Sequence, residues 1–167
     1  MTVIRQDMKN ENMVKVLLRG TEPDEIEAMW ATPVGNNLYR VDNSPFYAYG
    51  VSWQDIVEAL PTADGALEFE RVIENSGHRT VRVILESSSE SESGKRVLDQ
   101  VVAMGCSFEG MNRKLICVDV PSSANLEEVA QFLTEQKDVI WEYADPTYEE
   151  VTGDSPEPDP ESAPNEN

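Results

Sequence analysis

The sequence has no long hydrophobic run, few cysteines and a single histidine, and each shortage excludes a class of protein. No apolar stretch approaches the ~20 residues that span a bilayer, and residues 1–10 are too polar for a secretion signal. Two cysteines, Cys106 and Cys117, are too few for a disulfide scaffold. We therefore expect two buried thiols in a protein of the reducing cytoplasm, although a pairing between neighbouring strands stays open.

Catalytic and metal-binding motifs are also missing. The chain has no glycine-rich phosphate loop. As a general base, His78 would need an orienting carboxylate, such as Asp42 or Asp55, and a nearby nucleophile, such as Ser76. A lone histidine in a loop is more often a structural residue, and two cysteines with one histidine do not complete a usual zinc set. We expect no catalytic residue, no metal and no cofactor.

Basic residues are scarce. The chain has 32 acidic and 13 basic residues, a net charge of −19. Seven of the acids lie from Glu149 onward, yet residues 1–148 alone still carry −12. Such a surface repels nucleic acids and acidic membranes and attracts a basic protein. Solubility alone would explain the charge about as well.

Residues 13–77 are predicted to form a β-rich module. Short stretches rich in aromatic and β-branched residues alternate with turn residues at regular spacing, and Asp64-Gly65 is the strongest hairpin signal. Six stretches are predicted as strands: 14–19, 25–33, 38–41, 46–49, 54–60 and 66–74. This pattern predicts a small barrel or a strongly bent antiparallel sheet.

Residues 78–148 follow a different rhythm. The pattern predicts, in order, a strand, a helix, two strands, a helix capped by Asn125 with Glu128, and a last strand: 79–85, 95–104, 106–109, 114–120, from 125 onward and 139–144. The order β-α-β-β-α-β is the ferredoxin-like arrangement, so the predicted fold class is α+β with two unlike modules. Residues 1–12 are predicted to be a flexible N-terminus, and residues 149–167, acidic and rich in proline, a disordered tail.

Two groups of side chains are candidate sites. If residues 46–49 form a strand, Tyr47 and Tyr49 share one face, and exposed aromatic residues mark partner sites. The predicted partner-binding face comprises Asp42, Tyr47, Tyr49, Trp53, Asp55 and Glu58. The second candidate is an anion site at the junction of the modules, formed by His78, Arg79 and Arg82; internal pairing with nearby carboxylates is the structural alternative.

Two sequence elements carry a family resemblance. They are the run 38–57, with Asn43-Ser44-Pro45-Phe46 and Gly50 five residues before Asp55, and the run Ser76-Gly77-His78-Arg79-Thr80-Val81-Arg82. Together they resemble an uncharacterised family of bacterial domain-of-unknown-function proteins, over residues 14–146. The family has no established activity, so the resemblance assigns no catalytic residue. Some small acidic bacterial proteins are immunity proteins, and an acidic ferredoxin-like ribonuclease inhibitor is a fold-level analogue of the second half.

The sequence thus predicts a non-enzymatic, acidic, cytoplasmic binding protein. Its most concrete form is an immunity-type inhibitor that neutralises a basic toxin, for example a nuclease, through protein–protein interaction. Two alternatives stay open: a small-ligand-binding protein or enzyme that uses the anion site around His78, and a nucleic-acid mimic. The mimic requires carboxylates spaced like phosphates on one exposed face.

Overall fold

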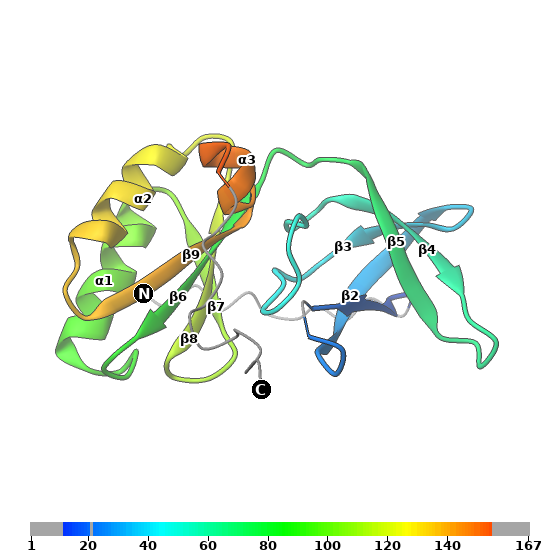
Figure 1. Ribbon diagram of the computed structural model, residues 1–167, viewed down its shortest axis with the longest axis horizontal. Coiled ribbons are helices and arrows are strands. Elements are labelled where there is room, and N and C mark those ends of the chain that lie inside the picture. The colour runs from blue at the N-terminus through cyan, green and yellow to red at the C-terminus, as the bar shows by residue number, and fades with distance from the viewer. Residues whose placement is uncertain (1–11, 21, 155–167) are drawn as a thin grey trace, which may run out of the picture.

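The computed structural model describes residues 12–20 and 22–154, and its first half is a closed five-stranded barrel (Figure 1). The strands are β1 (Val14–Arg19), β2 (Ile26–Gly35), β3 (Leu38–Val41), β4 (Ile56–Pro61) and β5 (Leu67–Glu74). Each strand pairs antiparallel with the next, and β1 closes the barrel by pairing in parallel with β5. Alternate residues point inward, among them the fully buried Val16, Met29 and Val57. The predicted small barrel is confirmed.

The second half is a four-stranded sheet with two helices. Its elements are β6 (Arg79–Leu85), α1 (Glu92–Ala103), β7 (Ser107–Gly110), β8 (Leu115–Val120), α2 (Leu126–Glu135) and β9 (Val139–Asp145). The strand order β7-β8-β6-β9 puts the first and third strands in the middle, which is the ferredoxin-like arrangement predicted from the sequence.

The two faces of this sheet have different neighbours. Val81, Val83, Ile116 and Val118 face the helices and form the buried core of the module. Helices α1 and α2 lie on the side of the sheet away from the barrel (Figure 1). The opposite face carries side chains such as Arg82 and Cys117, which contact the segment 42–55 of the barrel module.

Both predicted helices are present, and side-chain caps fix where they begin. Asn125 accepts hydrogen bonds from the N–H groups of Glu127 (3.0 Å) and Glu128 (3.2 Å), as the sequence predicts. Helix α1 begins at Glu92 rather than at residue 95, because the Ser91 hydroxyl accepts from the Gly94 N–H. Within the part of the chain that the structure describes, no helix combines the length and apolar character needed to cross a membrane.

The predicted strand over residues 46–49 is wrong. These residues form bends instead. The reason is that the Glu27 carboxylate accepts hydrogen bonds from three successive N–H groups, those of Phe46 (2.6 Å), Tyr47 (3.0 Å) and Ala48 (3.4 Å). A strand would point these groups alternately to opposite sides. The barrel therefore has five strands, and the connection between β3 and β4 is free to leave the barrel and cover the sheet.

The chain stays ordered past residue 149, where the sequence predicts disorder. Helix α3 (Tyr148–Thr152) is held by a capping box in which Thr147 and Glu150 satisfy each other's backbone N–H groups, and Gly153 ends it in the left-handed conformation. The rest of the predicted tail, and nearly all of the predicted flexible N-terminus, lie outside the described residues.

Candidate partner-binding site

Arg82 is the centre of the contact between the two modules. Its guanidinium donates to the carbonyl oxygen of Ala48 (2.8 Å) and to the carboxylate of Glu142 (2.8 Å), and it lies 4.3 Å from the centre of the Tyr49 ring. Only 3% of the residue is exposed. The Arg82 guanidinium contacts groups of both modules, so Arg82 holds the segment 42–55 against the sheet.

His78 and Arg79, the other members of the predicted anion site, also face carboxylates. His78 Nδ1 lies 2.9 Å from Asp119, and the Trp53 ring meets the imidazole edge-on at 4.8 Å. Arg79 lies 3.7 Å from Asp145. The three predicted residues therefore have separate acidic partners.

Further hydrogen bonds lie at this junction between the modules. Ser52 Oγ donates to Asp145 (2.6 Å) and lies 2.8 Å from the Thr80 hydroxyl. Asp55 is fully buried and accepts from the N–H groups of Ser52 (2.9 Å) and Ser76 (2.7 Å). Within residues 12–20 and 22–154, no three His, Cys, Asp or Glu side chains gather as a metal site.

The six residues of the predicted partner-binding face lie in different surroundings. Asp55 is inside the junction, Asp42 accepts from the Trp53 indole N–H (3.3 Å), and Glu58 pairs with an arginine on β5. Tyr47 donates to the sulfur of Met111 (3.0 Å). Tyr49 alone of the six lines a large groove along β9.

This groove runs along β9 and has a volume of about 1080 Å³. We call it the β9 groove. It is bounded by α2 on one side, by α3 at one end and by Tyr49 on the other side. Its lining residues are Tyr49, Glu127, Ala130, Gln131, Thr134, Trp141, Glu142, Tyr143, Thr147, Tyr148 and Glu149.

Aromatic rings line the β9 groove and are fixed in place. Trp141 and Tyr143 meet edge-to-face with their centres 4.8 Å apart, and the indole N–H of Trp141 donates to Thr134 (3.2 Å). The Tyr49 hydroxyl donates to Glu142 (2.7 Å). Tyr148, on α3, is nearly half exposed. The groove therefore presents preformed aromatic surface, with little side-chain freedom left to lose on binding.

Acidic residues concentrate in the same elements. Residues 121–154, which contain α2, β9 and α3, hold nine acids and one base, whereas residues 78–120 hold six of each. Burial and the hydrogen bond to Glu142 raise the pKa of Tyr49, and burial together with the charge of Glu127 raises the pKa of Tyr143. Both hydroxyls therefore remain protonated at neutral pH and can donate hydrogen bonds.

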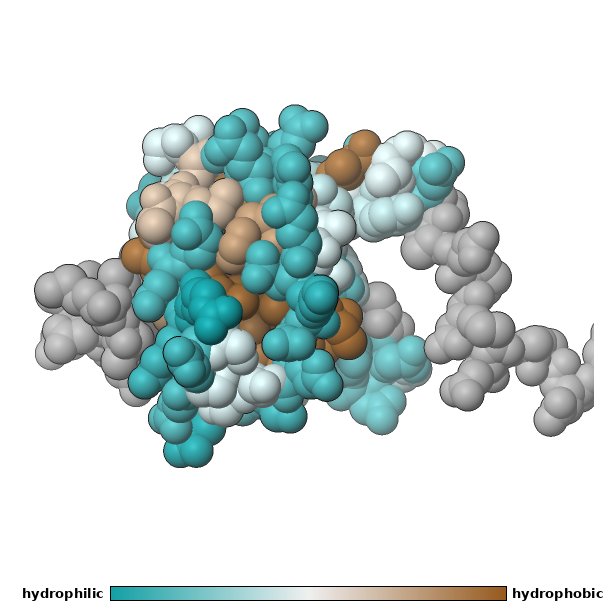
Figure 2. Space-filling view, turned by 90° about the vertical axis from the view of Figure 1, so that its left-hand side faces the viewer, coloured by the Kyte–Doolittle hydropathy of each residue, from teal (hydrophilic) through white to brown (hydrophobic). Residues whose placement is uncertain are grey.

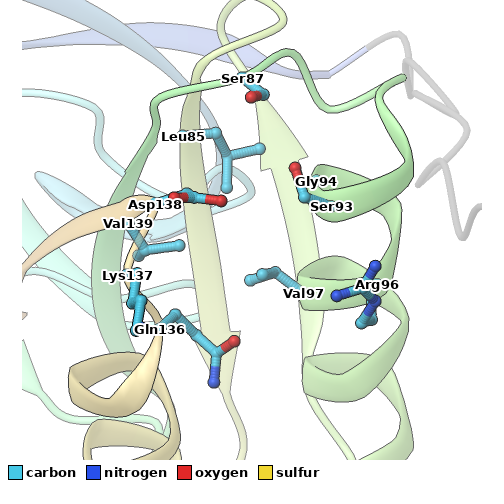
Figure 3. Close-up of a pocket in the computed structure, with 10 residues that line it drawn as sticks. All are labelled: Leu85, Ser87, Ser93, Gly94, Arg96, Val97, Gln136, Lys137, Asp138 and Val139. Carbon is cyan, nitrogen blue, oxygen red and sulfur yellow. The ribbon is translucent and has the colours of Figure 1, made fainter.

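Two other hollows of the described chain are smaller. One of about 50 Å³ lies between the start of α1 and the turn before β9, where Gly94 and Asp138 face each other (Figure 3). It has room for little more than water. The outer face of the helices is mainly hydrophilic around a smaller hydrophobic strip (Figure 2). An apolar pocket of about 290 Å³ adjoins the β9 groove on the face of the sheet opposite the helices. It is lined in part by Ile84, Leu115 and Ile140.

Sequence reasoning found Tyr49 but missed the rest of the β9 groove. Trp141, Tyr143 and Tyr148 lie in stretches that the sequence shows only as a strand and the start of a tail. The uneven charge was a usable signal, because counting acids per element would have singled out residues 121–154.

Comparison with known proteins agrees with the fold. A crystal structure of a hypothetical protein from Neisseria gonorrhoeae is similar, with a TM-score of 0.65 and 14% identity over 80% of this chain and 93% of that chain. No curated protein matches the chain. The family model described as a domain of unknown function (DUF4265) matches residues 27–143, which contain most of the barrel, the junction and nearly all of the ferredoxin-like module. The chain therefore belongs to the DUF4265 family.

Proposed function

We propose that this protein is a non-enzymatic acidic binding protein whose partner is a basic protein. In its most concrete form it is an immunity-type inhibitor that neutralises a basic toxin, such as a nuclease. The observation that carries the proposal is the β9 groove, where aromatic rings and the most acidic elements of the described chain coincide.

Aromatic rings and carboxylates side by side favour lysine and arginine side chains. A cation over the face of a tryptophan or tyrosine ring gains about 0.5–2 kcal/mol, depending on how dry the contact is. Glu127 on α2 and Glu149 on α3 are exposed and line the groove, and a carboxylate beside the ring adds an ion pair to the same cation. A segment with several basic residues would therefore bind more tightly than any single basic residue.

The junction supports a binding role over catalysis. His78 and its neighbouring arginines each face a carboxylate within the ferredoxin-like module, so the groups that could have served an anionic substrate already have acidic partners in the protein. The rigid junction then supplies what a binding surface needs, a fixed position for Tyr49 beside β9.

The test uses a seven-residue peptide of alternating lysine, Lys-Thr-Lys-Val-Lys-Thr-Lys, and a matched peptide with glutamate at each lysine position. Calorimetric titration of the full chain is expected to detect the basic peptide and not the acidic one. Replacing Glu127→Gln together with Glu149→Gln should weaken binding about five- to tenfold, and added salt should weaken binding to the wild type.

The control variant Glu70→Gln with Glu74→Gln removes the same two charges from exposed positions on β5. It should bind the peptide as the wild type does. Equal weakening by both double variants would overturn the groove as the site, because net charge alone would then explain the binding. Inhibition is read separately with a purified basic toxin: binding without loss of the toxin's activity at one equivalent would overturn the inhibitor role.

A further inference from the structure

The edge of β9 that faces away from β6 has no partner strand among the described residues. The strand order places β9 at the edge of its sheet. On its inner side, the Glu86 N–H donates to the Asp138 carbonyl (2.9 Å), and the register pairs Arg82 with Glu142 and Val83 with Trp141. Because bonded and non-bonded positions alternate in antiparallel pairs, the backbone groups of Val139, Trp141 and Tyr143 point outward.

This open edge forms the floor of the β9 groove. The lining comes from both faces of the sheet: Gln131 and Thr134 belong to α2 on the helical side, whereas Tyr49 and Glu142 lie on the opposite side. A groove that has walls on both faces of an edge strand lies over the edge itself. At one end the Gly50 N–H donates to the Ala144 carbonyl (2.8 Å), so the open stretch covers residues 139–143.

We propose that a basic segment of the partner binds in extended conformation and pairs with β9 as a fifth strand. The proposal rests on the proposed function for the basic character of the partner, and adds how the partner is held. Main-chain hydrogen bonds to the outward groups of Trp141 and its neighbours would supply affinity, and alternate side chains would supply specificity. One set of side chains would lie over Trp141 and Tyr143, and the other beside Glu142.

The second set of side chains would also reach an apolar surface. Ile140 is 72% exposed and Ile84 is 48% exposed. Both line the pocket that adjoins the groove on the face of the sheet opposite the helices. An extended segment that alternates basic and apolar residues would therefore match both sides of the edge. Natural edge strands usually carry charges that prevent pairing, and the side chain of Ile140 provides no such protection.

The charge selects a basic segment of another protein over a second copy of this chain. Two β9 edges paired with each other would bring together residues 121–154 of both copies, and this region holds nine acids and one base in each copy. Like charges opposite each other across paired strands are destabilising. A lysine- or arginine-containing strand meets the same carboxylates with opposite charge.

The test measures backbone hydrogen exchange of the isotope-labelled full chain with and without the basic peptide described above. Strand pairing predicts a pattern with a period of two. The N–H groups of Val139, Trp141 and Tyr143 should exchange at least about tenfold more slowly at saturating peptide, since each gains a hydrogen bond. Those of Ile140 and Glu142, which already bond to β6, should change far less.

A second peptide keeps every charge but carries N-methyl groups at its interior positions, so it cannot donate backbone hydrogen bonds. It should bind at least about tenfold more weakly than the unmodified peptide. Equal binding of the two peptides, or uniform slowing of exchange across residues 139–143, would overturn strand pairing while leaving the proposed function in place. Failure of the unmodified peptide to bind would overturn both.

Discussion

At the scale of single residues, carboxylates have two distinct uses in this protein. Glu127 and Glu149 are exposed beside the β9 groove, whereas Asp55, Asp119 and Asp145 are buried at the junction and accept hydrogen bonds there. Net charge counts both kinds equally. Asp55 was therefore predicted to lie on a binding surface, although it is buried and supports the junction from within.

Asp145 gives the junction a specific pH dependence. Burial raises its pKa, the nearby Asp55 adds to the shift, and Ser52 and Arg79 oppose it. The folded state therefore binds this proton more readily than the unfolded state. The resulting stabilisation is complete below the ordinary pKa of 3.8 and is lost as the pH rises through the raised value.

We predict that Asp145→Asn, which cannot ionise, gains stability relative to the wild type as the pH rises from below 4 to 7. Urea unfolding at both pH values measures the difference in the free energy of unfolding. The exposed Glu70→Gln serves as the control and should show a smaller change. A difference between Asp145→Asn and the wild type that stays constant with pH would contradict the prediction.

At the scale of elements, alternation of apolar and polar residues was sufficient for the regular parts. The strands over 14–19, 38–41 and 79–85 were predicted with their observed bounds, because apolar residues recur at every second position of each strand. The segment 46–49 was not, since its conformation depends on Glu27, which is distant in sequence. A local pattern cannot show such a contact.

Glu27 is therefore predicted to decide whether the segment 42–55 docks. Glu27→Ala removes the acceptor of three backbone N–H groups and should lower the free energy of unfolding by about 2–3 kcal/mol. Glu27→Gln keeps one acceptor oxygen and should cost less. Urea denaturation measures both, with the exposed Glu70→Ala as the control. A cost for Glu27→Ala no larger than that of the control would mean that water replaces the carboxylate.

The β9 groove marks the limit of prediction at this scale. Helix α2 and strand β9 were predicted, whereas α3 was predicted as part of a disordered tail and the Tyr49 segment as a strand. The groove also depends on how these elements meet in space. Trp141 lies on β9, Tyr148 on α3 and Tyr49 on the segment that Glu27 bends. Only the folded chain brings these three rings to one edge of the sheet.

At the scale of the whole molecule, charge is distributed unevenly. Residues 12–77 hold eleven acids and four bases, residues 78–120 are balanced, and residues 121–154 carry a net charge of −8. The resulting field would guide a basic partner toward the α2–β9–α3 side of the ferredoxin-like module, where the groove is found.

The two cysteines lie on opposite faces of the sheet and are both free and buried. The Cys117 thiol donates to the Pro45 carbonyl (2.9 Å) across the junction, whereas Cys106 packs in the core beneath the helices. Burial raises the pKa of Cys106 to about 11 and raises that of Cys117 as well. Both sulfurs therefore stay protonated and unreactive at neutral pH in the closed molecule.

Each sulfur thus reports on a different opening of the molecule. Alkylation of Cys117 by iodoacetamide requires the barrel to separate from the sheet, and alkylation of Cys106 requires the helical layer to lift. We predict that mass spectrometry in increasing urea detects modification of Cys117 first, because hydrogen bonds hold the junction while an apolar core holds the helices. Simultaneous modification would show instead that the two halves unfold as one cooperative unit.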